Sequence, residues 1–231
     1  MPRLFRTRRA LDFFRKMISP VHMENKNCFH VLVITDIFGR TKAIDSLADA
    51  FSSQGRPCRV IDPYTGERPD FPSEQEAYVG FLSRTGHSRY SGRVKREIEA
   101  TRDDCVVVGF SAGASCAWKA LEGISSGRVR HFIGFYPGRI RKHLTVRPSC
   151  PATLIFPKME DHFDVHAVIL ELTAIRGVEC IRTGFLHGFM NPCSENHSPE
   201  GAGQFTRSLT NGTDIIDPAR FRPVAASIGK E

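Results

Sequence analysis

The stretch CVVVGFSAGASCAWKAL, residues 105–121, decides the fold that this sequence predicts. Its first four residues are apolar and mostly β-branched, which is typical of a strand buried on both faces. Gly-Phe-Ser-Ala-Gly follows at 109–113, and a helix-compatible segment then continues to Leu121. Gly-x-Ser-x-Gly between a strand and a helix is the nucleophile elbow, a tight turn that exposes the serine hydroxyl. We therefore expect Ser111 to be a nucleophile at the end of a strand.

Short apolar runs recur on both sides of this stretch, and helix-like segments separate them. The expected strands are Phe29–Thr35, Cys58–Ile61, Cys105–Gly109, Phe132–Tyr136, Thr153–Phe156 and Val178–Arg182. The expected helices are Lys42–Phe51, Arg93–Ala100, Ala112–Leu121 and Asp164–Ile175. Alternating strands and helices predict an α/β fold, a mostly parallel, doubly wound sheet flanked by helices.

The length of 231 residues favours one domain. Hydrophobic residues make up 41% and charged residues 25%, which excludes a wholly disordered chain. We expect a basic leader at 1–27, the α/β domain at 28–193, and a largely irregular C-terminal segment at 194–231 with one short helix near Gln204–Leu209. The leader fits a loose tail, a start placed too early with Met17 or Met23 as the true initiator, or an organelle-targeting helix.

The formal net charge of +7 is concentrated at one end, because residues 1–16 alone carry +5. The rest of the chain has no basic stripe, so we expect no nucleic-acid partner. The longest aliphatic run, Val31–Ile34, has four residues against the roughly 20 that a membrane span needs. Seven cysteines without a Cys-x-x-Cys pair argue against a disulfide framework and a zinc module, and favour a cytoplasmic location.

A serine hydroxyl needs a general base, and the elbow predicts an acid and then a histidine later in the chain. Acidic side chains occur at 160–164, just after the fifth expected strand. His187 follows the sixth and lies between Gly184 and Gly188. Ligands of parallel sheets bind outside the carboxyl ends of the strands, where all three segments are expected. The order therefore predicts a Ser-acid-His triad.

Four segments of the chain resemble the dienelactone hydrolase family of the α/β-hydrolase fold. They are Thr35-Asp36-Ile37-Phe38-Gly39, the elbow at 109–113, Glu160-Asp161-His162-Phe163 and His187-Gly188-Phe189, and together they span about 29–190. The resemblance implies a compact fold with no obvious lid and a reaction without a cofactor. It also implies Asp161 as the triad acid, ahead of Glu160 and Asp164, and an oxyanion hole formed by the backbone N–H groups of Ile37 and Ala112.

The chain departs from the family pattern at three positions. Ser111 stands where the founding enzymes carry cysteine, Asp36 stands in place of glutamate, and Asn191 occupies the position four residues after the histidine where those enzymes carry an arginine. These differences favour a broader ester substrate. Asp36 has two interpretations, either a polar gate beside the nucleophile or a cap of the helix Lys42–Phe51.

A metal site is the competing interpretation of one segment. Asp161, His162 and His166 are ligand types, and the two histidines are spaced i, i+4. No further ligand is specified, so we expect neither a metal nor another cofactor.

The predicted function is a serine hydrolase that cleaves small carboxylic esters or lactones through an acyl-enzyme, with a small-molecule substrate as its partner. The alternatives are a non-catalytic binding or regulatory module of the same fold and a thioesterase or acyl-protein esterase. A monomer or a homodimer fits the sequence equally well.

Overall fold

A six-stranded parallel sheet forms the centre of the molecule. The computed structural model describes residues 29–124, 127–210 and 214–229, so the predicted leader at 1–27 lies outside the described residues. The strand order is β2-β1-β3-β4-β5-β6, with every pair parallel. The strands are β1 (His30–Ile34), β2 (Cys58–Ile61), β3 (Cys105–Phe110), β4 (Val129–Phe135), β5 (Ala152–Phe156) and β6 (Val178–Arg182). The predicted parallel α/β fold is confirmed.

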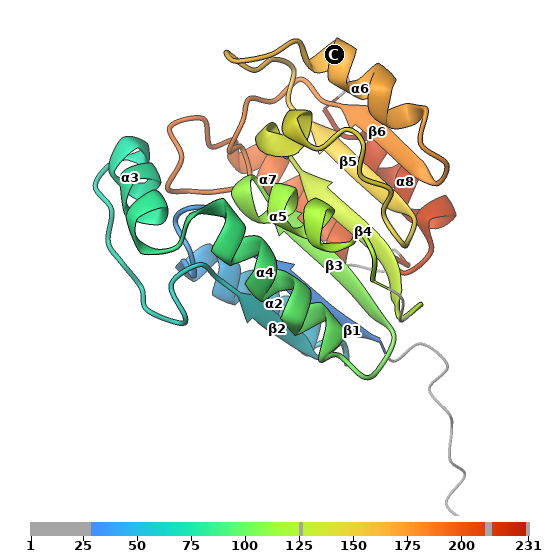
Figure 1. Cartoon of the computed structure of the whole chain (residues 1–231), viewed down its shortest axis with the longest axis horizontal. Coiled ribbons are helices and arrows are strands. Elements are labelled where there is room, and N and C mark those ends of the chain that lie inside the picture. The colour runs from blue at the N-terminus through green and yellow to red at the C-terminus, as the bar shows by residue number, and fades with distance from the viewer. Residues whose placement is uncertain (1–28, 125–126, 211–213, 230–231) are drawn as a thin grey trace, which may run out of the picture.

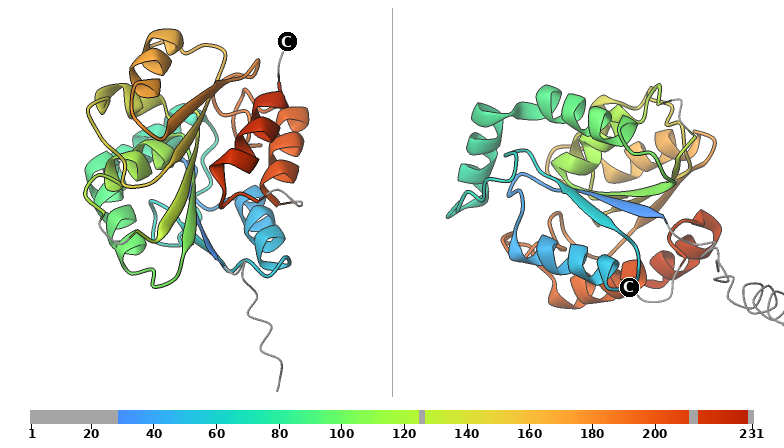
Figure 2. Two further views of the ribbon diagram at one scale, coloured as in Figure 1. Left: turned by 90° about the vertical axis from the view of Figure 1, so that its right-hand side faces the viewer. Right: turned by 90° about the horizontal axis from the view of Figure 1, so that it is seen from below.

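Helices cover both faces of this sheet (Figure 1). They are α2 (Lys42–Ser52), α3 (Glu74–Arg84), α4 (Gly86–Glu99), α5 (Ala112–Ala120), α6 (Val165–Thr173), α7 (Pro199–Thr210) and α8 (Pro218–Ser227), with a 3₁₀ turn η1 at Gly138–Lys142. Figure 2 shows α2, α7 and α8 on one face and α4, α5 and α6 on the other. No helix in the described ranges is long and apolar enough to cross a membrane.

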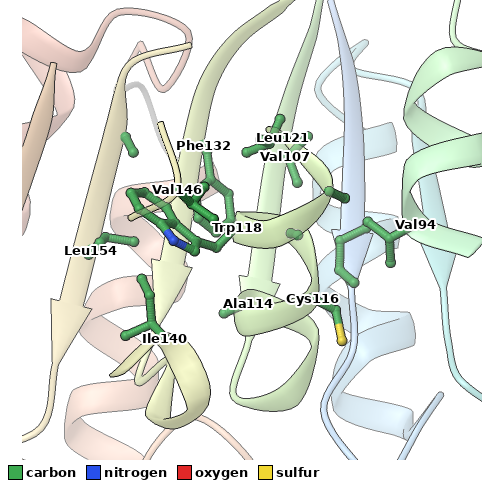
Figure 3. Packing of buried hydrophobic residues seen from close by; sticks show 14 of the residues in the cluster. Val94, Val107, Ala114, Cys116, Trp118, Leu121, Phe132, Ile140, Val146 and Leu154 are labelled. Carbon is green, nitrogen blue, oxygen red and sulfur yellow. The ribbon is translucent and has the colours of Figure 1, made fainter. Parts of the chain in front are cut away.

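The sheet has one hydrophobic core on each face, because side chains alternate along the strands. The first core lies under α4, α5 and α6, and the second lies under α2, α7 and α8. In β1, Leu32 points into one core while Val31 and Val33 point into the other. Figure 3 shows the first core around Trp118 of α5, whose indole N–H donates to the carbonyl oxygen of His143 at 2.9 Å. Because both faces are covered, every residue of β3 is buried, as its apolar run predicts.

The prediction of a largely irregular segment at 194–231 is wrong for its described part, although the short helix predicted near Gln204–Leu209 does lie within α7. This segment forms α7 and α8, which close the second core with the buried side chains of Phe205 and Phe221. Both helices contain residues that weaken a helical pattern, glycines at 201 and 203 in α7 and Pro223 inside α8. Tertiary packing outweighs this weak propensity, so the folded unit extends well past residue 193.

Replacing Phe205 by alanine tests the structural role of α7. The side chain is fully buried, with its ring centroid 5.3 Å from that of Phe135 and 5.5 Å from that of Phe189. We expect a loss of about 3–5 kcal/mol in the free energy of unfolding, measured by denaturant titration. The matched control is Val224→Ala on the half-exposed side of α8, which should change it by less than about 0.5 kcal/mol. Equal stabilities for the two variants would contradict the packing described here.

The segment between β2 and β3 also forms helices where the sequence predicts only one. α3 was not expected, and α4 begins at Gly86 rather than Arg93. The buried stripe of α3 consists of Ala77 and Phe81 alone, too narrow for a clear helical period. α3 stands at the edge of the molecule in Figure 1, beside the carboxyl ends of the strands.

Candidate active site

Ser111 stands at the turn between β3 and α5, as the elbow pattern predicts. Its backbone has φ 47° and ψ −113°, a strained conformation for a residue with a side chain. The chain can pass here only because the residues two positions before and after Ser111 are glycines. A Cβ on Gly113 would lie 2.2 Å from the carbonyl oxygen of Thr35, and one on Gly109 would lie 2.7 Å from Ala114 Cα. The small residues therefore let β1 and α5 approach the turn closely.

Three side chains from separate loops form a continuous chain of hydrogen bonds. Ser111 Oγ lies 2.8 Å from His187 Nε2, and His187 Nδ1 lies 2.7 Å from Glu160 Oε1. Glu160 belongs to the loop after β5 and His187 to the loop after β6, so both lie at the carboxyl ends of the strands, beside the elbow. The carboxylate is the more enclosed partner, at 11% side-chain exposure against 26% for the imidazole. A carboxylate on Nδ1 leaves Nε2 free to accept a proton from the serine.

Among the described residues, the carboxylate bonded to His187 is Glu160, whereas the sequence analysis assigned this position to Asp161. Local backbone geometry explains the difference. Glu160 forms an isolated bridge with Phe163, and the exposed tip of the turn between them holds Asp161. Glu160, at the base of this turn, is the residue whose carboxylate reaches the imidazole. Asp161 instead lines the outer part of the same cavity.

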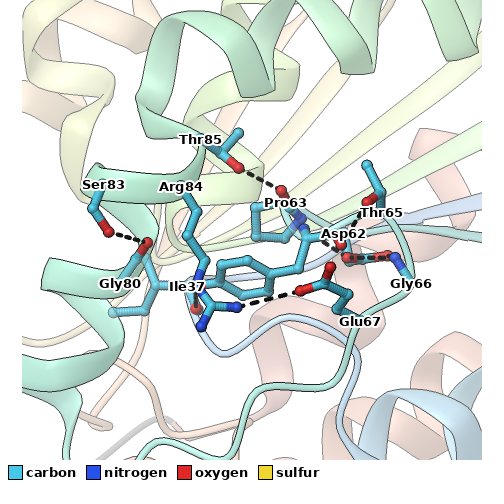
Figure 4. Close-up of polar contacts among 11 residues, drawn as sticks. Ile37, Asp62, Pro63, Thr65, Gly66, Glu67, Gly80, Ser83, Arg84 and Thr85 are labelled. Atoms are coloured by element: carbon cyan, nitrogen blue, oxygen red, sulfur yellow. Dashed lines mark hydrogen bonds and ion pairs between the residues drawn. The ribbon is translucent and has the colours of Figure 1, made fainter.

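Ser111 and His187 open into a cavity of about 510 Å³. Ile37 and Ala112, the expected oxyanion residues, both line it. Ala112 is the first residue of α5, where backbone N–H groups lack intrahelical partners and the helix dipole favours negative charge. The Ile37 loop is held in place by the Tyr64 hydroxyl, which donates to the Ile37 carbonyl oxygen. Figure 4 shows Ile37 beside the polar contacts of the segment 62–67 and of the end of α3.

Asp36 is buried beside this site and does not cap α2. The N-cap of that helix is Thr41, whose hydroxyl accepts from the Ile44 amide. Asp36 Oδ1 accepts from the Phe38 amide at 2.9 Å, and Oδ2 accepts from Asn191 Nδ2 at 2.6 Å. Burial raises the pKa of this carboxyl to about 6 despite those bonds. Asp36 therefore ties the loop after β1 to the loop that carries the histidine.

Several residues of the cavity wall carried no sequence signal. Gln75 and Tyr78 of α3 form one side, and Arg139 and Arg141 of η1 form another. His87 lies beside Arg139, and its pKa is lowered to about 4 by burial and then by the nearby guanidinium, so this imidazole is neutral. These residues belong to segments that are far apart in the sequence, and only the fold brings them together.

The residues of the alternative metal site do not form one. No group of three or more ligand-type side chains within residues 29–124, 127–210 and 214–229 could hold a metal ion. Asp161 and His162 line the cavity wall, and His166 lies in the first turn of α6.

Comparisons with known proteins place the chain in a family. It is 40% identical over 123 residues to the uncharacterized protein YczH of Bacillus subtilis. The match covers 52% of this chain and 57% of that protein, so the chain spans just over half the length of this relative. A candidate dienelactone hydrolase from Klebsiella pneumoniae has a TM-score of 0.60 at 14% identity, covering 84% of this chain and 86% of that one. Dienelactone hydrolase from Anabaena variabilis has a TM-score of 0.51 at 15% identity, covering 73% and 80%.

At such low identities the two solved structures establish the α/β-hydrolase fold alone. The family model is more specific, since the dienelactone hydrolase model matches residues 18–200, which include the elbow and the loops that carry Glu160 and His187. On this match, the chain belongs to the dienelactone hydrolase family.

Proposed function

We propose that the protein is a serine hydrolase that cleaves small carboxylic esters or lactones through an acyl-enzyme. The observation that carries the proposal is the hydrogen-bond chain from Ser111 through His187 to Glu160, at 2.8 and 2.7 Å. A serine hydroxyl is a weak nucleophile, and an imidazole at this distance can take its proton as the bond to carbon forms. Membership of a hydrolase family supports the same chemistry.

In the first half-reaction, Ser111 Oγ attacks the ester carbonyl while His187 Nε2 accepts the hydroxyl proton. Glu160 accepts the Nδ1–H hydrogen bond, which fixes the tautomer and stabilises the imidazolium. The carbonyl oxygen becomes an oxyanion beside the amides of Ile37 and Ala112, each of which contributes about 3 kcal/mol to the lowering of the barrier. His187 then gives its proton to the leaving alkoxide, and the alcohol departs.

In the second half-reaction, water replaces the alcohol. His187 accepts a proton from the water as its oxygen attacks the acyl carbon, and the tetrahedral intermediate forms in the same oxyanion hole. The proton returns to Ser111 Oγ as the acyl bond breaks, and the carboxylic acid leaves. With a lactone, the alcohol and the acid remain parts of one opened product.

A fluorophosphonate probe tests this proposal directly. Serine hydrolases form a stable phosphonyl ester at an activated serine, so we expect one equivalent of label on the peptide that contains Ser111, identified by mass spectrometry. His187→Ala should label at least a hundredfold more slowly, because the hydroxyl loses its base. Heat-denatured protein is the control for non-specific reaction. A folded protein that takes up no label would instead support the non-catalytic module.

A further inference from the structure

A second cavity, of about 400 Å³, lies behind the candidate active site. Its walls come from α2, α7 and the loop at 190–197, and it shares no lining residue with the cavity that contains Ser111. Figure 2 shows α2 and α7 on the same face of the sheet. The volume lies within the range of about 300–1,000 Å³ that is usual for small-molecule sites. This cavity is therefore large enough for a ligand of its own.

The inner part of the second cavity is mostly apolar. Leu47 of α2, Phe110 at the end of β3 and Tyr136 are buried there, and Ile44 and Met190 complete the apolar wall. Opposite them, α7 presents the small residues Ala202 and Gly203, which leave the space open. A chain of methylene groups would replace water along this surface, at a gain in affinity of roughly fourfold per buried methylene.

The charges of this cavity are separated between its two ends. Arg207 is exposed at the outer end, and its Nη1 lies 3.4 Å from the position that a Cβ on Gly203 would occupy. No ion pair within the described residues uses this guanidinium. His197 also lines the wall, and the buried carboxyl of Asp36 lies at the inner end. An anionic group is therefore attracted to the outer end and repelled from the inner one.

We propose that the second cavity binds a medium-chain carboxylic acid, with its carboxylate on Arg207 and its alkyl chain between α2 and α7. Arginine suits this task because its planar guanidinium can donate two parallel hydrogen bonds to a carboxylate. The apolar wall and the small residues of α7 accommodate the chain. This site does not depend on the proposed hydrolase activity, since none of its residues belongs to the Ser111–His187–Glu160 chain.

An acid bound in the second cavity would lie close to residues that contact His187. The ring of Tyr136, which lines the second cavity, lies 5.0 Å from the ring of His187 between centroids. Asp36 and Asn191 line it too, and their hydrogen bond connects the loop after β1 with the histidine loop. A ligand here therefore contacts the residues that position the imidazole, without entering the cavity in front of Ser111.

Isothermal titration with sodium decanoate below its micelle concentration tests the proposal. We expect saturable 1:1 binding with a submillimolar Kd, and octanoate, two methylenes shorter, should bind roughly fifteenfold more weakly. Gly203→Phe fills the second cavity and should weaken decanoate binding at least tenfold. The matched control is Gln75→Phe, which places the same bulk in the front cavity, the one that contains Ser111. This variant should leave the Kd for decanoate within twofold of the wild type. Ala43→Phe, on the opposite wall, replaces Gly203→Phe if that variant does not fold.

The head group is tested separately at Arg207. Arg207→Met keeps most of the side-chain length and should weaken decanoate binding at least fivefold, whereas Arg207→Lys, which keeps the charge, should remain within about threefold of the wild type. No saturable binding by the wild-type protein would overturn the proposal. So would binding that is lost in Gln75→Phe and retained in Gly203→Phe, because the acid would then occupy the front cavity.

Discussion

Replacing Ser111 by alanine is expected to lower kcat for a short p-nitrophenyl ester by roughly 10⁴-fold or more. The variant keeps the cavity and the oxyanion amides but has no nucleophile, so only weak electrostatic catalysis of direct water attack remains. His187→Ala should lose a similar factor, because the serine and its base act as one unit. The double variant should therefore be no slower than either single variant by more than about tenfold.

The loss of activity in Ser111→Ala is informative only if the variant still folds. Ser111 has a positive φ of 47°, and alanine bears the same strain without the hydroxyl, so we expect the melting temperature to stay within a few degrees of the wild type. Active-site titration with a fluorophosphonate gives the concentration of functional wild-type sites. Retention of more than a tenth of the wild-type kcat by well-folded Ser111→Ala would refute the proposed mechanism.

The parts of the fold that the sequence predicts correctly are those in which one signal dominates. β2 and β6 have the predicted bounds, and β3 differs by one residue, because short apolar runs flanked by turns admit few alternatives. The elbow is equally constrained, since only glycine fits beside Thr35 and Ala114. At such positions the local sequence and the tertiary fold require the same structure.

The missed features depend on packing that no local pattern records. The sequence predicts a helix only near Gln204–Leu209. The rest of α7, which contains two glycines, forms because Phe205 is buried against the aromatic side chains of the second core. α3 depends on Phe81 in the same way within the first core. The second cavity has no sequence signal at all, because α2 and α7 meet only in the folded chain.

The choice between two adjacent carboxylates depends on the backbone of a single turn. Both Glu160 and Asp161 follow β5 at a distance that can reach His187, and the family resemblance favours the second. In the structure the hydrogen bond to His187 comes from the first, which is bridged to Phe163, while Asp161 lies at the exposed tip of the turn. Which of the two the reaction uses is open to a direct experiment.

Glu160→Gln is expected to lower kcat by about 10³–10⁴-fold, while Asp161→Asn should remain within threefold of the wild type. The glutamine keeps nearly the same size as glutamate but carries no charge, so it cannot stabilise the imidazolium, and its amide can present a donor to Nδ1 and favour the wrong tautomer. Asp161 lies outside the hydrogen-bond chain and contributes only an exposed charge at the cavity edge. Steady-state hydrolysis of the same p-nitrophenyl ester measures both variants.

The relative losses in the two variants show which carboxylate acts on the imidazole. The reverse pattern, a large loss in Asp161→Asn with Glu160→Gln nearly unaffected, would mean that the turn rearranges when substrate binds and would return the acid role to Asp161. Comparable large losses in both would instead show that the two carboxylates act together on one imidazole.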